Sequence, residues 1–262
     1  MQSVAVITGG ASGIGRACAL RMANEGHAVA ILDLQIDAGR ETVELIRAQG
    51  GNAGFFECNV ADHNSIAQAA RQVEDTLGET RVLVTCAGLI PHAESILDLD
   101  IERHDRLWQV NYHGTLHSCR IFGRLMRDRR QGAIVTLGSI NSLRPMPLPA
   151  YNVSKVAVHR LTELLAMELG PHGVRANCVG PTFVMTEGLQ QKIAEGKRDL
   201  SVMLSQQALD ALPTPDDIAD AVAFLCSKAA ARITGVLLPI DAGWTPGVSY
   251  YSYAGGLPWV RT

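Results

Sequence analysis

The chain has 262 residues, of which 47% are hydrophobic and 19% are charged. A chain of this length and composition buries a sizeable core, which excludes a disordered protein and fits one large domain. Its 26 acidic and 23 basic side chains give a formal charge of −3, the wrong sign for a protein that binds nucleic-acid backbones. We therefore expect a globular protein with no nucleic-acid partner.

Cysteine usage and hydropathy predict a cytoplasmic protein. The six cysteines are scattered without a CxxC pair, and several lie in apolar runs that are typical of small buried residues. No charged leader with a cleavage site precedes the first apolar run at 4–8, and no apolar stretch approaches the ~18 residues of a membrane helix. Secretion and membrane insertion are therefore not expected.

Short apolar runs alternate with segments of helical periodicity along the first part of the chain. Alternation of this kind predicts βαβ units, in which a parallel sheet carries helices on both faces. The expected strands span 4–8, 28–32, 53–57 and 81–85, and the expected helices between them span 13–25, 37–49 and 62–77.

The alternation continues less regularly in the second part of the chain. A helical region is expected at 101–129 with an interruption near 111–114, followed by a strand at 132–137 and a helix at 150–169. Further strands are expected at 174–179 and 235–240. No internal repeat or linker divides the chain, so residues 1–262 are predicted to form a single α/β domain, a doubly wound Rossmann-type parallel sheet with helices on both faces.

Two segments interrupt this pattern. The segment 186–212 has helical periodicity but is set apart by glycines and a proline turn, which is typical of a lid over a pocket. The tail 244–262 is aromatic, and we expect it to pack against a second subunit. Its large aromatic side chains include Tyr250, Tyr251, Tyr253 and Trp259.

A glycine-rich turn joins the first strand to the first helix. Glycines at this junction let the backbone approach a pyrophosphate, and the free amides and positive dipole of the helix start attract its charge. The turn therefore predicts a dinucleotide site, although an ordinary strand-to-helix turn remains an alternative. The residues expected to contact the cofactor here are Gly9, Ser12, Gly13, Ile14 and Gly15.

Asp33 follows the second strand, where a carboxylate accepts hydrogen bonds from the adenosine ribose hydroxyls and repels a 2′-phosphate. The next residue is Leu34 rather than an arginine, so nothing compensates that repulsion. The sequence therefore predicts NAD as the cofactor rather than NADP. The alternative is that Asp33 only begins a turn.

Tyr151 and Lys155 stand four residues apart in the strongest expected helix, so their side chains project from one face. A phenol is a poor base near neutral pH, and a nearby ammonium group together with a positively charged nicotinamide would lower its pKa. Ser139 follows the fifth strand, where a hydroxyl could hold the substrate oxygen while Tyr151 transfers its proton. In the alternative interpretation, Tyr151 packs on the sheet, Lys155 extends to solvent and Ser139 is a turn residue.

Five motifs in sequence order resemble those of the short-chain dehydrogenase/reductase family, and the resemblance covers essentially the whole chain. They are Thr8-Gly9-x-x-x-Gly13-Ile14-Gly15, Ala87-Gly88, Asn111, Ser139 and Tyr151-x-x-x-Lys155. The resemblance implies a strand order 3-2-1-4-5-6-7 and a dimer or tetramer. It also implies that Tyr151 is the catalytic acid/base, that Lys155 lowers its pKa and holds the nicotinamide ribose, that Ser139 positions the substrate, and that Asn111 supports a water linked to the lysine.

The same resemblance implies further cofactor contacts, at Asn59, Val60, Ala87, Gly88, Pro181, Val184 and Thr186. The chain departs from the family pattern at three places: Thr85-Cys86 replaces two asparagines, Asn59 replaces an aspartate, and Thr182 replaces a glycine. Because none of these changes removes a proton-transferring group, they concern the detailed fit of the cofactor rather than the reaction class.

The expected reaction is the interconversion of a secondary alcohol and a ketone by an NAD-dependent oxidoreductase. Asn141, Arg144 and His92 would make the pocket polar, which favours a small sugar, polyol or hydroxy acid. One alternative is a 3-oxoacyl thioester reductase, whose acyl carrier partner calls for a basic surface that this chain lacks. Another is a non-catalytic dinucleotide sensor, which would need only the glycine turn and Asp33.

His113 and His117 are four residues apart on the expected helix, a spacing at which two imidazoles can share a metal ion. No glutamate lies between them and no third ligand is evident, so we expect no metal site.

Overall fold

A computed structural model describes residues 2–90, 93–252 and 254–256. All neighbouring strands in its seven-stranded sheet run parallel, in the order β3-β2-β1-β4-β5-β6-β7, which confirms the expected doubly wound Rossmann-type topology. The strands are β1 (Val4–Thr8), β2 (Ala28–Asp33), β3 (Ala53–Glu57), β4 (Thr80–Thr85), β5 (Gly132–Leu137), β6 (Val174–Pro181) and β7 (Leu237–Ile240).

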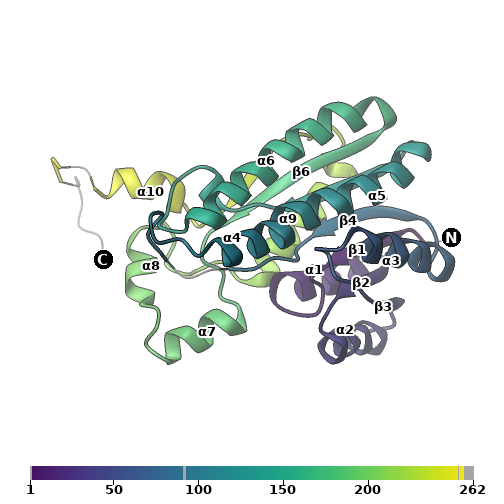
Figure 1. The fold of residues 1–262 in the computed structure, drawn as a ribbon, viewed down its shortest axis with the longest axis horizontal. Coiled ribbons are helices and arrows are strands. Elements are labelled where there is room, and N and C mark those ends of the chain that lie inside the picture. The colour runs from purple at the N-terminus through teal and green to yellow at the C-terminus, as the bar shows by residue number, and fades with distance from the viewer. Residues whose placement is uncertain (1, 91–92, 253, 257–262) are drawn as a thin grey trace.

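Helices cover both faces of this sheet, and a separate group stands at its carboxyl edge (Figure 1). The helices that follow the first five strands are α1 (Gly13–Asn24), α2 (Ile36–Ala48), α3 (His63–Thr76), α4 (Ile101–Trp108), α5 (Gly114–Asp128) and α6 (Pro149–Leu169). The later helices are α7 (Glu187–Ala194), α8 (Leu200–Ser205), α9 (Pro215–Cys226) and α10 (Trp244–Tyr250).

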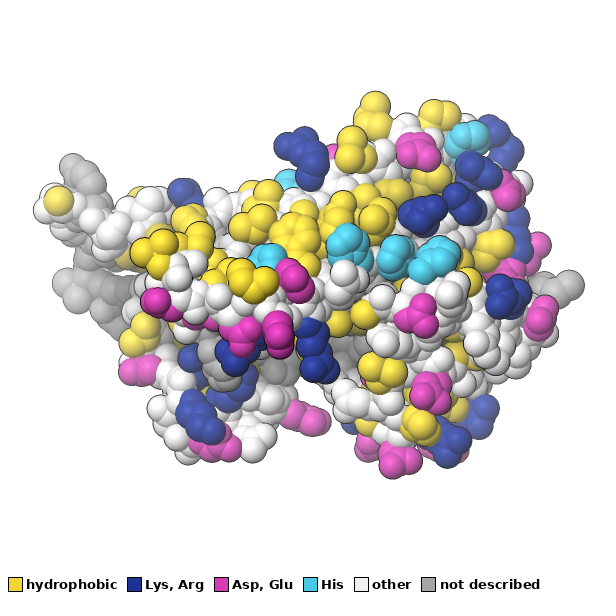
Figure 2. Space-filling model, viewed as in Figure 1, with side chains coloured by type: hydrophobic (Ala, Val, Ile, Leu, Met, Phe, Trp, Pro, Cys, Tyr) yellow, Lys and Arg dark blue, Asp and Glu magenta, His cyan; other side chains and the backbone are white. Residues whose placement is uncertain are grey.

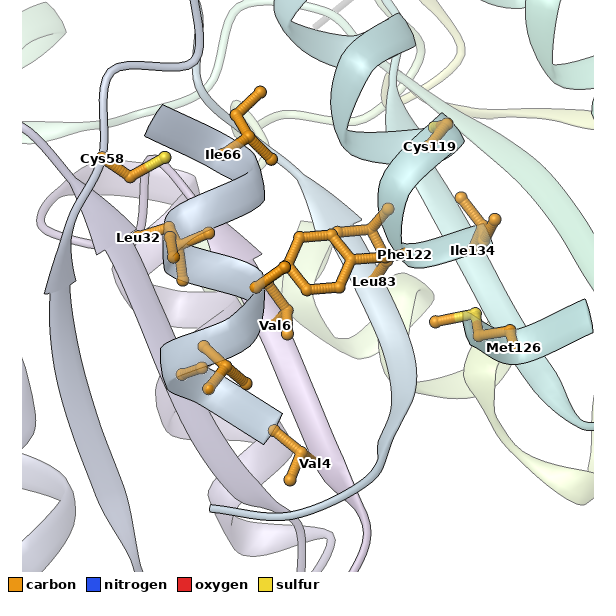
Figure 3. Close-up of a cluster of buried hydrophobic side chains, with 14 of the residues drawn as sticks. Val4, Val6, Leu32, Cys58, Ile66, Leu83, Cys119, Phe122, Met126 and Ile134 are labelled. Carbon is orange, nitrogen blue, oxygen red and sulfur yellow. The ribbon is translucent and has the colours of Figure 1, made fainter. Parts of the chain in front are cut away.

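Alternating side chains of the central strands build two separate cores, because successive residues of a strand point to opposite faces. Val4 and Val6 of β1 face a cluster that includes Ile66 of α3 and Phe122 of α5 (Figure 3). Ala5 and Ile7 face a second cluster formed with α1, α2 and α9. Both faces of the sheet are therefore buried, which explains why its strands are continuous apolar runs.

The structure differs from the expected elements at several places. Helix α9 was not expected: the proline turn near 213–215 begins a helix, with Pro215 in its first turn and a capping box between Thr214 and Asp217. The expected interruption near 111–114 is a π-helical turn, Gln109–His113, that joins α4 to α5 without a break. Strand β6 also runs two residues further than expected, to Pro181.

The segment expected as a lid forms α7 and α8, which stand outside the helical layers at the carboxyl edge of the sheet (Figure 1). Its base is fixed where the Met185 amide donates a hydrogen bond to the Pro213 carbonyl at 2.8 Å. Among the described residues, no helix combines the length and apolar character needed to cross a membrane.

Candidate active site

The glycine-rich turn after β1 has a conformation that other residues would not tolerate. Gly9 has φ +69° and Gly13 has φ +51°, in the left-handed region that favours glycine. A β-carbon on Gly9 would lie 2.6 Å from the Ala87 nitrogen, and one on Gly15 would lie 1.9 Å from the Gly9 carbonyl oxygen. The glycines thus let the turn pack closely against the end of β4 and the start of α1.

The start of α1 fits the phosphates of a dinucleotide. Ser12 is the N-cap residue, but its side chain makes no capping hydrogen bond, and no acidic residue lies in the first turn. The amides of Gly13, Ile14 and Gly15 therefore have no side-chain cap, and they stand at the positive end of the helix dipole. An anion is the natural partner of such an end.

The Asp33 carboxylate is held in place at the end of β2. Its Oδ2 accepts a hydrogen bond from the Ala11 amide at 3.0 Å, and its Oδ1 accepts one from the Gln35 amide at 3.0 Å. Leu34 is exposed and lines a groove along the sheet edge together with Asn59. The Asn59 Oδ1 accepts a hydrogen bond from the Ala61 amide at 3.1 Å, so this side chain also shapes its own turn.

Asn111 holds the segment that follows β4. Its Oδ1 accepts a hydrogen bond from the Leu89 amide at 2.7 Å, and its Nδ2 donates one to the Leu89 carbonyl at 3.0 Å. Asn111 is fully buried in the π-helical turn, directly beside Gly88, where an added β-carbon would lie 3.4 Å from its Oδ1. The neighbouring Ala87 amide donates a weak hydrogen bond to the Thr8 hydroxyl at 3.4 Å. The expected residues Ala87, Gly88 and Asn111 thus form one connected wall.

Val60 links the loop after β3 to the same helix. It is buried, and its side chain lies where a β-carbon on Gly114 would come within 2.9 Å. Any larger residue at Gly114 would displace the loop that carries Asn59 and Val60.

The structure brings Ser139, Tyr151 and Lys155 together at the carboxyl edge of the sheet. The Ser139 hydroxyl accepts a hydrogen bond from the Asn141 amide at 3.1 Å and also hydrogen-bonds the Tyr151 side chain. One turn further along α6, the Lys155 Nζ lies 5.5 Å from the centroid of the Tyr151 ring. The four-residue spacing therefore places the Tyr151 and Lys155 side chains close together, and Tyr151 reaches the serine.

Burial dominates the protonation of this pair. It raises the pKa of Tyr151 to about 12, although the hydrogen bond with Ser139 lowers that pKa in part. Burial also lowers the pKa of Lys155 to about 8. The Lys155 Nζ donates a hydrogen bond to the Leu137 carbonyl at 2.6 Å. The expected lowering of the Tyr151 pKa by the ammonium together with a bound nicotinamide therefore stays a prediction.

The residues after β6 lead from the sheet to the lid. Pro181 ends β6 and pairs with Ile240 of β7, and Val184 is buried in the core beside β1 and α9. Thr186 caps α7 by accepting a hydrogen bond from the Leu189 amide at 3.3 Å. A β-carbon on Gly13 would lie 3.6 Å from the Thr186 methyl group, so the lid begins against the phosphate-binding turn.

Three polar atoms at the ends of neighbouring strands have no hydrogen-bond partner within the described part of the chain. They are the buried Oγ1 of Thr85 at the end of β4, Oδ1 of Asn141 after β5 and Oγ1 of Thr182 after β6. In the sequence, Thr85 and Thr182 were noted only as departures from the family pattern. Their positions at the carboxyl ends of strands, where ligands of such folds bind, could have identified them as candidate ligand contacts. Of the other expected substrate contacts, Arg144 is exposed, and His92 lies outside the described residues.

Histidines gather on α3, on α5 and at the end of the π-helical turn that precedes α5. The His113 and His117 rings have centroids 6.1 Å apart, and the His63 ring lies 5.2 Å from that of His117. Within residues 2–90, 93–252 and 254–256, no group of three or more His, Cys, Asp or Glu side chains is placed to hold a metal ion.

A doubly wound sheet with a glycine turn at its first βα junction and Ser139, Tyr151 and Lys155 at its carboxyl edge defines a nucleotide-dependent oxidoreductase. A family model described as Enoyl-(Acyl carrier protein) reductase matches residues 9–245. The chain belongs to the short-chain dehydrogenase/reductase family, whose members bind a nicotinamide dinucleotide, and it is an oxidoreductase that acts on alcohol groups of small molecules.

Individual relatives span nearly the whole chain. Galactitol 2-dehydrogenase from Rhizobium johnstonii is 35% identical, with 92% of this chain and 94% of that protein covered. D-threitol dehydrogenase from Mycolicibacterium smegmatis is 38% identical, with 92% of each chain covered. The crystal structure of a 3-oxoacyl-[acyl-carrier protein] reductase with bound NAD from Brucella melitensis has a TM-score of 0.84 and 26% identity, and covers 93% of this chain and 91% of that chain.

Proposed function

We propose that this protein is an NAD-dependent dehydrogenase that interconverts a secondary alcohol and a ketone in a small polyol or sugar alcohol. The observation that carries this proposal is the convergence of Ser139, Tyr151 and Lys155 at the carboxyl edge of the sheet, the edge at which the phosphate-binding turn follows β1. A dinucleotide sensor would need only the turn and Asp33, so the complete set of three side chains favours an enzyme.

Each residue has a distinct part in the proposed reaction. The Ser139 hydroxyl holds the substrate oxygen, and the Tyr151 phenol gives a proton to that oxygen in ketone reduction or takes one in alcohol oxidation. A bound nicotinamide supplies the hydride acceptor or donor. The Lys155 ammonium holds the nicotinamide ribose, and Asn111 maintains the wall next to the lysine through its bonds to Leu89.

We infer NAD rather than NADP from the charge at the end of β2. The fixed Asp33 carboxylate would accept hydrogen bonds from the ribose hydroxyls and repel a 2′-phosphate. The phosphates would lie over the amides of Gly13, Ile14 and Gly15, with Gly9 and Ser12 beside them. The remaining proposed cofactor contacts are Leu34, Asn59, Val60, Ala87, Gly88, Pro181, Val184 and Thr186.

The polyol assignment rests on polarity and on the relatives. The buried Oδ1 of Asn141 lacks a partner among described residues, and it lies next to Ser139 in the 3₁₀ turn after β5. A substrate with several hydroxyl groups offers hydrogen-bond donors for such acceptors. Galactitol and D-threitol, named for two relatives, are compounds of this class.

A 3-oxoacyl thioester reductase is the second candidate, favoured by the description of the matching family and by the similarity to the NAD-bound 3-oxoacyl-[acyl-carrier protein] reductase. An acyl carrier partner is acidic and calls for a basic surface on the enzyme. The formal charge of this chain is −3, so it would repel such a partner. We therefore rank this activity below the polyol dehydrogenase.

A substrate panel tests the proposal. Purified protein is mixed with NAD⁺ or NADP⁺ and galactitol, D-threitol, other polyols or hydroxy acids, and formation of the reduced cofactor is followed by absorbance; the reverse direction is run with a 3-oxoacyl thioester. We expect turnover of a polyol with NAD⁺. Thioester reduction alone would support the second candidate, and tight NAD⁺ binding without any turnover would support a sensor.

We also propose a cytoplasmic homodimer or homotetramer. Its support is a row of exposed apolar side chains on α6, namely Val153, Val156, Leu164 and Met167. Figure 2 shows apolar side chains gathered over α6 and α4 on this face of the molecule. Exposed apolar surface on a helix of a globular protein is typical of a protein interface.

A further inference from the structure

Ala11 connects the proposed ribose-binding carboxylate to an arginine. The Ala11 amide donates to Asp33 Oδ2 at 3.0 Å, and the Ala11 carbonyl accepts a hydrogen bond from the Arg16 Nε at 3.0 Å. A guanidinium and a carboxylate are therefore tied to opposite ends of one residue in the phosphate-binding turn. A 2′-phosphate on a ribose bound at Asp33 would be repelled by this carboxylate and attracted by the guanidinium of Arg16.

Glu41 holds that guanidinium. Its Oε2 accepts a hydrogen bond from the Arg16 Nη2 at 2.9 Å, which joins the first turn of α1 to the middle of α2. The Arg16 side chain is 22% exposed and that of Glu41 is 60% exposed. Arg16 is thus fixed by two acceptors, the Ala11 carbonyl and the Glu41 carboxylate, and it forms an ion pair with the second.

We propose that Glu41 is a specificity-determining residue for the cofactor. By binding Arg16, it keeps the guanidinium from reaching toward a 2′-phosphate. The inference rests on the proposed ribose site at Asp33, and it adds to the repulsion by Asp33 a second element, the restraint of Arg16 by Glu41.

Other charged residues of α2 determine which control variants the test needs. Arg40 lies on the same helix and lines the groove beside Leu34, so it is a competing cation for a 2′-phosphate. Glu44 is exposed on α2 and pairs with Arg47 at 3.1 Å, one turn from Glu41. Replacing Glu44 removes the same charge from the same helix and also frees an arginine, but not one that is bonded to the phosphate-binding turn.

Isothermal titration calorimetry with NAD⁺ and with NADP⁺ tests the proposal on the whole chain. The variants are Glu41→Ala, the matched control Glu44→Ala, and the double variant Arg16→Gln/Glu41→Ala. We expect Glu41→Ala to bind NADP⁺ about fivefold more tightly at low salt, as the release of one exposed ion pair permits, while its NAD⁺ affinity changes less than about twofold. The control should leave the ratio of the two affinities unchanged, and the double variant should lose the gain.

Several results would overturn the role of Glu41. These are an NADP⁺ affinity unchanged from that of Glu44→Ala, an equal loss for both cofactors, or a gain that survives Arg16→Gln, since Arg40 or the lost charge alone would then explain it. Unmodified protein that prefers NADP⁺ would overturn the proposed cofactor as well. A normal NAD⁺ preference with an unresponsive Glu41→Ala variant overturns only the inference about Glu41.

Discussion

Tyr151 is a protonated phenol at neutral pH in this structure, because burial raises its pKa to about 12. A protonated phenol can donate a proton to a ketone oxygen without any prior change, whereas alcohol oxidation requires the phenol to lose its proton first. The side chain that changes charge near physiological pH is Lys155, whose pKa burial lowers to about 8. Tyr151 therefore transfers the proton in the proposed reaction, and Lys155 is the neighbouring group whose charge changes near neutral pH.

The pH dependence of ketone reduction should report Lys155. Below pH 8 the ammonium form predominates and can hold the nicotinamide ribose, and above about pH 8 it is lost while Tyr151 keeps its proton. We expect the rate of reduction to fall as the pH rises through about 8. A rate profile from pH 6 to 10 measures this fall. In Lys155→Arg, whose side chain stays protonated, the midpoint of the fall should move upward by more than one pH unit. If the rate of Lys155→Arg fell at the same pH, a group other than Lys155 would be responsible for the fall.

The π-helical turn between α4 and α5 determines the position of Asn111. Its inserted residue brings the Asn111 amide group opposite the backbone of Leu89, where one side chain satisfies both a donor and an acceptor. Removing that side chain leaves the segment after β4 without its two bonds and opens a cavity.

We expect Asn111→Ala to reduce the free energy of unfolding by about 2 kcal/mol, measured by urea denaturation. Activity should fall together with stability, because the same segment carries Ala87 and Gly88. A variant as stable as the unmodified protein would show that the segment after β4 does not depend on Asn111.

The histidines between α3 and α5 should make this pair of helices sensitive to acid. Burial lowers the pKa of His117, and repulsion from His63, His113 and Arg120 adds to this, against a smaller opposite effect of Asp62. A folded-state pKa below the ordinary value of about 6.5 means that His117 contributes stability above that value and loses it as the pH falls. We expect His117→Gln to lose less stability than the unmodified protein between pH 8 and pH 5, in urea titrations at both values. Equal losses would contradict this role.

Local patterns predicted most of the fold but not its irregular parts. Continuous apolar strands and left-handed glycines depend on local chemistry. Local patterns therefore predicted β1, the turn at Gly9 and Gly13, and the helix that carries Tyr151 and Lys155. Helix α9 also carries a local signal, the Thr214 capping box, which the adjacent prolines obscured. The π-helical turn and the pKa of Tyr151 depend on packing between distant segments, so no local pattern could predict them.

At the scale of the molecule, the surface of α6 is a second candidate interface beside the aromatic tail. In the tail, Trp244 is 5% exposed and buried within its own chain, Tyr250 is 49% exposed, and Tyr253 and Trp259 lie outside the described residues, so the packing of the tail against a second subunit stays a prediction. The exposed apolar residues of α6 form two pairs, Val153 with Val156 and Leu164 with Met167. The exposed Arg160 lies between the pairs, and the five residues recur at three- to four-residue intervals along one face of the helix.

We expect multi-angle light scattering to give a dimer or tetramer for the unmodified protein and a smaller assembly for Met167→Asp, because a charge at this position on α6 would be buried in the interface. The matched control is Val202→Asp, which changes a residue of 56% exposure on α8 and should leave the mass unchanged. A monomeric unmodified protein would contradict the proposed assembly.

The most direct test of the account is a comparison of NAD⁺ binding and turnover in Tyr151→Phe. The variant removes one hydroxyl and leaves the glycine turn, Asp33 and Lys155 in place. Using the best polyol from the substrate panel, we predict that its kcat falls by about a thousandfold, as expected for the loss of a general acid/base, while its dissociation constant for NAD⁺ changes by less than about threefold. Turnover close to that of the unmodified protein would contradict the account, because the proton would then be transferred without Tyr151.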